Sequence, residues 1–191
     1  TGVQTCALPI FRERVPEDNS VRTVARYRLF SESLTTDSEV FEMLADEREF
    51  NAADLEERNV ELEVTVAIPV SDEGAPVSHQ DSRLFCYFPA SNDTLLPFDV
   101  QADFLLKSNR EEIRPGHPLN ERFLSVAGWL VETAISEFKA DDIAPEALLE
   151  LVPDLAEDRP SYLDPLLKRT RESVSRQEIV PVASGDVYRP E

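Results

Sequence analysis

Residues 118–139 carry an apolar stripe at helical spacing, and this stripe is the strongest constraint on how the chain can fold. The stripe consists of Phe123, Leu124, Ala127, Leu130, Val131, Ala134, Ile135 and Phe138. A helix with so continuous an apolar face is stable only when another element covers that face. Pro118 suits the first turn of the helix. His117, just before it, is interpreted as a helix cap, with a phosphate contact as the alternative.

Alternating segments supply the sheet that this helix needs. In Val60–Val70 every second side chain is apolar, which predicts a strand with one buried face. Val21–Phe30, Leu84–Phe88 and Phe98–Leu106 are also predicted as strands. Turn-rich segments separate the last three strands, so we expect an antiparallel meander, with a hairpin loop at Ser71–Ser82. The predicted fold class is α+β, a two-layer, mainly antiparallel sheet packed by a long helix.

Two further N-terminal features have a predicted structure. Arg22, Arg26 and Arg28 share one face of the first strand. We interpret that face as solvated or as a sheet edge. The alternative is a docking surface for an acidic neighbour or for a missing part of the chain. Thr36–Arg48 is predicted as a helix that begins with a capping box at Thr36.

The chain divides into three predicted parts. Residues 1–10 (TGVQTCALPI) resemble translated sequencing adapter, so we expect them to be non-native and exclude them from fold prediction. Residues 11–140 form the α/β domain. Residues 141–191 form an extension and the start of a following module, with short helices at Pro145–Leu151 and Pro165–Val174. A hairpin joins Glu178–Val182 to Val187–Tyr188, and we expect the whole to be a fragment of something longer.

The charge balance limits the possible partners. The chain has 38 acidic and 19 basic residues and a net charge of −19, which disfavours nucleic acid or an anionic membrane as a global partner. No apolar run is long enough to span a membrane. Scarce lysine, at positions 107, 139 and 168 only, indicates a halophilic origin; the alternative is an ordinary acidic, soluble protein. Without Cys6, the single remaining Cys86 fits a reducing cytoplasm and is interpreted as a buried strand residue.

The chain lacks the sequence motifs of several kinds of active site. The glycines are too far apart for a dinucleotide fingerprint or a P-loop, and one cysteine with His79 and His117 cannot form the common zinc sites. What remains is the loop that begins at Lys107 and contains Arg110. An arginine offers a planar fork of donors that matches phosphate. Equally, Arg110 could pair with a neighbouring carboxylate, Glu111, Glu112 or Asp103, and only order the turn.

One run of motifs resembles a known family. It comprises Phe-Pro-Ala (88–90), Leu-Pro-Phe-Asp-Val-Gln-Ala-Asp-Phe-Leu-Leu (96–106), Ser-Asn-Arg-Glu-Glu-Ile (108–113) and Asn120. This run resembles the sacsin-like ATPases, which include NO VEIN-like proteins and belong to the GHKL superfamily of heat-shock chaperones and histidine kinases. The resemblance covers about Arg22 to Lys139, with a weaker echo at Glu178–Pro190. The family usually has Trp where this chain has Leu119.

The resemblance implies a post-ATP-binding middle domain of transducer type. An upstream Bergerat-fold domain in the same polypeptide would hold ATP and Mg²⁺, and this chain alone would not hydrolyse ATP. Asn109-Arg110-Glu111 looks like the Ser-Arg-Glu loop motif of the related chaperone. Arg110 is then the catalytic, phosphate-sensing cation, with Lys107 and Asn109 as further nucleotide contacts. The parent would act on protein clients as a chaperone or remodelling ATPase.

Two other functions stay open from the sequence. The chain could be a non-catalytic protein–protein interaction module that uses the arginine face and Trp129, which we interpret as a packing or interface residue. It could also be a degenerate ATPase scaffold inside a prokaryotic defence or DNA-processing protein.

Overall fold

The computed structural model describes residues 4–6, 10–14, 21–34, 40, 43, 62–78, 81–91, 94–153, 160–177, 180–181 and 187–188. The strands are β1 (Gln4–Cys6), β2 (Ile10–Arg14), β3 (Val21–Leu34), β4 (Leu62–Pro69), β5 (Leu84–Cys86), β6 (Phe88–Pro89), β7 (Asp99–Gln101), β8 (Val180–Pro181) and β9 (Val187–Tyr188). The helices are α3 (Pro118–Ala140), α4 (Pro145–Leu148), the 3-10 turns η1 (Leu149–Leu151) and η2 (Ser161–Leu163), and α5 (Asp164–Arg176). Helical backbone is also described at Val40 and Met43; the rest of the predicted Thr36–Arg48 helix lies outside the described residues.

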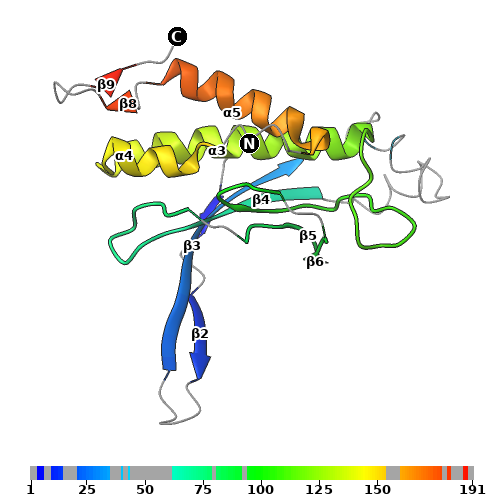
Figure 1. The fold of residues 1–191 in the computed structure, drawn as a ribbon, viewed down its shortest axis with the longest axis horizontal. Helices are drawn as coiled ribbons and strands as arrows, with labels where there is room; N and C mark the ends of the chain where they lie inside the picture. Colours follow the sequence, from blue (N-terminus) through cyan, green and yellow to red (C-terminus); the bar gives the residue numbers. More distant parts are fainter. Residues whose placement is uncertain are drawn as a thin grey trace.

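The long helix packs on one face of the sheet, as its apolar stripe requires. In Figure 1, α3 runs above β4, and α5 lies on the side of α3 that faces away from the sheet. All eight residues of the predicted stripe are buried, and they meet buried side chains of β4 such as Val64, Val66 and Ile68. The structure therefore confirms the α+β class, with a mainly antiparallel sheet packed by a long helix.

The two helices approach closely at Gly128. A Cβ atom at that position would lie 2.8 Å from the Cβ of Arg169 and 2.8 Å from the carbonyl oxygen of Leu166. Only a residue without a side chain permits this spacing. The same hydrophobic core continues from α3 into α5 through Leu163, Leu166 and Leu167. The predicted helices near 145–151 and 165–174 and the hairpin of β8 and β9 are all present.

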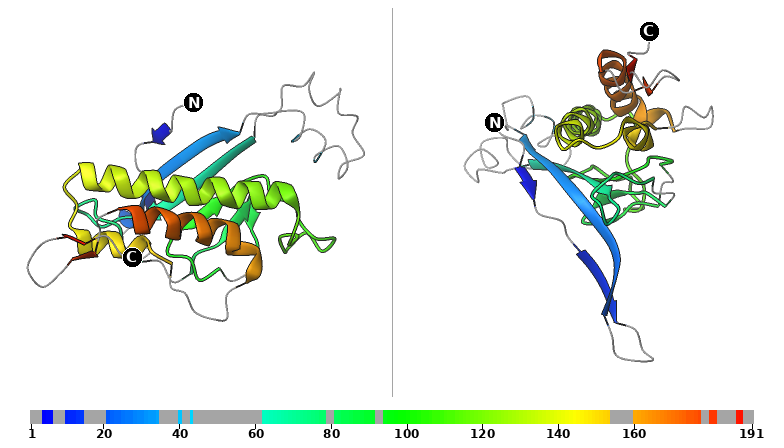
Figure 2. Two further views of the ribbon diagram at one scale, coloured as in Figure 1. Left: turned by 90° about the horizontal axis from the view of Figure 1, so that it is seen from above. Right: turned by 90° about the vertical axis from the view of Figure 1, so that its left-hand side faces the viewer.

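The strand order differs from the predicted meander. The main sheet runs β1-β3-β4-β7-β5-β6, and β2 also pairs with β3. In Figure 2, β2 and the start of β3 form a ribbon that extends away from the helices. The neighbour of β4 is β7, and β5 lies beyond β7 and pairs with it in parallel. The meander prediction was therefore wrong, because β7 returns to lie between β4 and β5.

The predicted hairpin loop at Ser71–Ser82 contains a tight turn, but it does not join two paired strands, because β4 and β5 are not neighbours in the sheet. Val70 bridges Pro76, the Val77 amide donates to the Pro69 carbonyl at 3.0 Å, and Gly74 adopts a left-handed φ of 84°. The chain thus folds back on the end of β4, and β7 pairs with β4 farther along, at Thr65–Ala67.

Two predicted strands are shorter than expected. Tyr87 has a φ of 62°, so Leu84–Phe88 reverses direction and becomes two strands, β5 and β6. In Phe98–Leu106, side chains alternate between buried and more exposed up to Phe104, but ladder pairing ends at Gln101. The alternation of buried and exposed side chains after Gln101 therefore reflects an extended backbone beside the core, outside the strand β7.

Arg28, on the arginine face of β3, packs against the long helix, although that face was predicted to be solvated. Arg28 forms ion pairs with Glu137 at 2.7 Å and Asp141 at 2.5 Å, both near the end of α3. Its guanidinium also lies 5.4 Å from the ring centroid of Phe30 and 4.9 Å from that of Phe138. The acidic neighbours of Arg28 are therefore residues at the end of the molecule's own long helix, whereas Arg26 pairs with Asp72.

Candidate functional site

The Arg110 hairpin, residues 106–113, is closed by backbone hydrogen bonds. Leu106 and Ile113 form an antiparallel bridge, and the Lys107 amide donates to the Glu112 carbonyl at 2.7 Å. The Arg110 amide donates to the Lys107 carbonyl at 2.9 Å, which completes a four-residue turn. Arg110 is the last residue of that turn and has a φ of 59°; a left-handed conformation costs a residue with a side chain about 1 kcal/mol.

Side chains inside the loop bind one another. Lys107 forms an ion pair with Glu112 at 2.5 Å. Asn109 donates its amide hydrogen to Glu112 at 3.1 Å and accepts hydrogen bonds from the backbone amides of Glu111 and Glu112. The hydrogen bond and charge of Lys107, with help from Asn109, lower the pKa of the Glu112 carboxyl. Lys107 and Asn109, both predicted to contact a nucleotide, are thus engaged in holding the loop.

Arg110 differs from these two residues. Its side chain is exposed, and it has no hydrogen-bond or ion-pair partner in the described part of the chain. It therefore makes none of the local pairs, with Glu111, Glu112 or Asp103, that would give it a purely structural role. A free guanidinium on a closed hairpin can donate two parallel hydrogen bonds to a phosphate or carboxylate brought to it.

Asn120 joins the hairpin to the long helix. It is 1% exposed, and its carboxamide oxygen accepts a hydrogen bond from the Leu105 amide at 2.8 Å. Its carboxamide nitrogen donates to the carbonyls of Leu105 and Arg114, each at 2.9 Å. The sequence motifs include Asn120 but predict no role for it. A polar residue at the start of the apolar face of a helix was the one feature of the sequence that pointed to a buried hydrogen-bonding role.

The start of α3 is also capped as predicted. The His117 imidazole accepts a hydrogen bond from the Leu119 amide at 3.2 Å. Leu119, at the position where the resembled family usually has Trp, is fully buried. The hydrogen bonds of Asn120 to Leu105 and Arg114, called the Asn120 clamp below, attach the hairpin to the first turn of α3, which His117 caps.

Comparisons with family models, with curated proteins and with solved structures found no match for this chain. The functional assignment therefore depends on the sequence motifs and on the geometry of the hairpin.

Tyr87 and Phe88 form an exposed aromatic tip at the turn between β5 and β6. Their side chains are 78% and 81% exposed, although large apolar side chains normally gain free energy by burial. The backbone amide of Ser91 donates to the carbonyl of Glu111 at 2.8 Å, so the segment after β6 contacts the residue that follows Arg110. Two adjacent exposed aromatic side chains form an apolar surface of the kind that binds a partner.

Cys86 is only partly buried, and its thiol donates to the Phe104 carbonyl at 3.2 Å. Among the described residues, no group of three or more His, Cys, Asp or Glu side chains is placed to hold a metal ion. No described helix is long and apolar enough to cross a bilayer. His79 lies outside the described residues.

Proposed function

We propose that this chain is the middle domain of a sacsin-like GHKL ATPase and that Arg110 contacts the γ-phosphate of a nucleotide held by an upstream domain. The observation that carries this proposal is the state of Arg110. It is exposed and unpaired within the described residues, while its neighbours Lys107 and Asn109 are used to shape the loop that carries it.

The chemistry asked of Arg110 is electrostatic. Negative charge builds up on the transferred phosphoryl group, and a positioned guanidinium stabilises it. The hairpin offers one free cation and no set of oxygen ligands, so it suits a phosphate contact and leaves Mg²⁺ and the rest of ATP to the upstream domain. Lys107 has a part in this scheme as the residue that keeps the loop closed.

The clamp by Asn120 supports a coupling role. A force on Arg110 from a bound phosphate would reach the first turn of α3 through the hydrogen bonds to Leu105 and Arg114. The long helix would then carry the nucleotide state to the rest of the parent protein, whose clients would be other proteins. A cytoplasmic location is part of the proposal, because the usable sequence holds a single cysteine.

The test uses the polypeptide that contains both this segment and an ATP-binding domain. Arg110→Ala should lower the ATP turnover number by about a hundredfold or more, since arginines that stabilise phosphoryl transfer contribute that much. The dissociation constant for ATP should stay within about twofold. Arg110→Lys keeps the positive charge but loses the planar guanidinium, so its turnover number should lie between those of the wild type and Arg110→Ala. Unchanged turnover in Arg110→Ala would refute the assignment.

A second function, a non-catalytic protein-interaction module, is favoured by the aromatic tip. Tyr87 and Phe88 are the most exposed large apolar side chains among the described residues. This function predicts that Tyr87→Ser with Phe88→Ser abolishes capture of a partner, whether or not the parent binds ATP. An upstream sequence without nucleotide-binding motifs would favour this function, or the degenerate scaffold, over the ATPase.

A further inference from the structure

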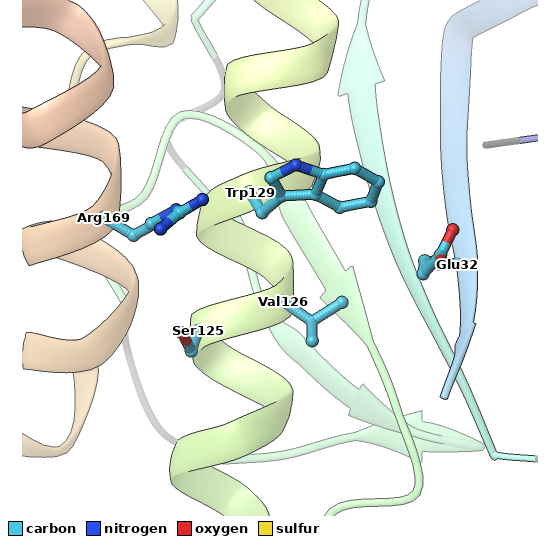
Figure 3. Close-up of a pocket in the computed structure, with 5 residues that line it drawn as sticks. All are labelled: Glu32, Ser125, Val126, Trp129 and Arg169. Carbon is cyan, nitrogen blue, oxygen red and sulfur yellow. The ribbon is translucent and has the colours of Figure 1, made fainter. Parts of the chain in front are cut away.

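Residues of β3, α3 and α5 line a groove of about 360 Å³ (Figure 3). It is lined by Glu32, Ser125, Val126, Trp129 and Arg169. Its volume is at the lower end of the range of about 300–1,000 Å³ for small-ligand sites. The groove is therefore large enough for a small metabolite or one long side chain.

Glu32 is an unusual residue for its position. It alternates with Phe30 and Leu34, so it belongs to the β3 face that packs toward α3, and both of those neighbours are buried. Its side chain is partly buried and has no hydrogen-bond or ion-pair partner among the described residues. A partly desolvated carboxylate without a partner is unfavourable. Arg28, four residues earlier on the same face, is paired by two carboxylates of α3 or its C-terminal end, Glu137 and Asp141.

Trp129 separates Glu32 from a positive charge. In Figure 3 the indole extends from α3 toward Glu32 on β3, and the guanidinium of Arg169 extends from α5 on the opposite side of the indole. Arg169 forms an ion pair with Glu132, whose Oε2 lies 3.7 Å from the Arg169 Nε, and this distance is too long for a hydrogen bond. Arg169 thus retains donors for a further anion.

We propose that this groove binds a ligand with an ammonium group at one end, a carboxylate at the other and an aliphatic chain between them. The ammonium would pair with Glu32, the carboxylate with Arg169, and the chain would lie on Trp129 and Val126. The two charges must be separated because Glu32 and Arg169 lie on opposite sides of the indole. An ω-amino acid has this chemistry, and so does a lysine at the carboxyl terminus of a peptide.

Trp129 is the only tryptophan in the chain, so its fluorescence reports binding directly. We expect a saturable change on titration with 6-aminohexanoate. Pentylamine and hexanoate, which each carry one of the two charges, should bind about tenfold or more weakly, since a charged hydrogen bond contributes at least that factor. A peptide that ends in lysine, compared with the same peptide amidated at its carboxyl terminus, identifies the source. Preference for the free acid form over the amide supports a protein terminus, and binding of 6-aminohexanoate alone supports a metabolite.

Matched variants test the two ends separately. Glu32→Gln should weaken binding of 6-aminohexanoate about tenfold or more and leave binding of hexanoate unaffected. Arg169→Gln should also weaken binding of 6-aminohexanoate about tenfold or more, but leave binding of pentylamine unaffected. Glu150→Gln, at an exposed position of η1, and Arg110→Ala should both bind like wild type. The proposal is overturned if 6-aminohexanoate gives no saturable change, if Glu32→Gln binds equally well in a folded variant, or if pentylamine binds as tightly as the zwitterion.

Discussion

Asn120 and Leu105 form two reciprocal hydrogen bonds, 2.8 and 2.9 Å long. The side chain of a helix residue thus pairs with the backbone amide and carbonyl of Leu105 at the base of the hairpin. A third bond, to the Arg114 carbonyl, ties the other base of the same hairpin. One buried carboxamide therefore positions both ends of the loop that carries Arg110.

Replacement of Asn120 by Ala should destabilise the fold by about 3 kcal/mol, because the buried amide of Leu105 would lose its partner and the carbonyls of Leu105 and Arg114 would each lose a donor. Urea unfolding followed by circular dichroism measures this free energy. Ser125→Ala, on the exposed side of α3, is the control and should change stability by no more than about 0.5 kcal/mol. If Asn120→Ala lost no more stability than this control, the Asn120 hydrogen bonds would not be needed for the stability of the fold.

Arg28→Met should lower the free energy of unfolding by about 1–2 kcal/mol, since it removes two ion pairs and contacts with two aromatic rings. Arg26→Met is the matched control, because the partner of Arg26 is Asp72, whose side chain is 82% exposed. That variant should lose about 0.5 kcal/mol or less. Equal effects of the two substitutions would contradict the interior role of Arg28.

Gly128→Ala should destabilise the protein by about 1–3 kcal/mol, because the added methyl would press α5 away from α3. Alanine is otherwise the better helix former by about 1 kcal/mol, so the sign of the effect separates packing from helix propensity. Thermal unfolding of the variant measures it. A more stable Gly128→Ala would mean that the two helices do not approach as closely as in the structure.

The Glu112 carboxyl should titrate below the ordinary glutamate range of about 4.3, because its folded-state pKa is lowered mainly by Lys107. A lowered pKa means that this pair stabilises the fold at pH values above the unfolded pKa and ceases to do so as the pH falls through the folded pKa. Carbon-detected NMR titration of the side chain gives the value directly. Lys107→Met should move the pKa up toward the ordinary range, and an unmoved pKa would assign the shift to another group.

Local patterns were sufficient to predict the elements themselves. Helical spacing in residues 118–139 and alternation in residues 60–70 each depend on one repeat over a short window, and α3 and β4 follow them closely. The cap by His117 also depends only on neighbouring residues. The same kind of pattern could not place β5, because an alternating segment specifies which face is buried but not which strand lies beside it.

The role of each charged residue required the tertiary structure. Alternation put Arg28 on the same face as Phe30, yet the acidic residues that pair with Arg28 come from the far end of a helix more than a hundred positions later. In the hairpin, both Lys107 and Arg110 were candidates for a free cation. Only the closed turn, which brings Glu112 back to Lys107, leaves Arg110 as the exposed one.

The sequence by itself thus determined the fold class, the long helix and the loop worth examining, because each depends on periodicity or on a short contiguous motif. Tertiary structure alone decided the strand order, the clamp by Asn120 and the groove between Glu32 and Arg169. Those features depend on contacts between residues far apart in the chain, whose free energies are set by burial and distance and leave no repeat in a local window.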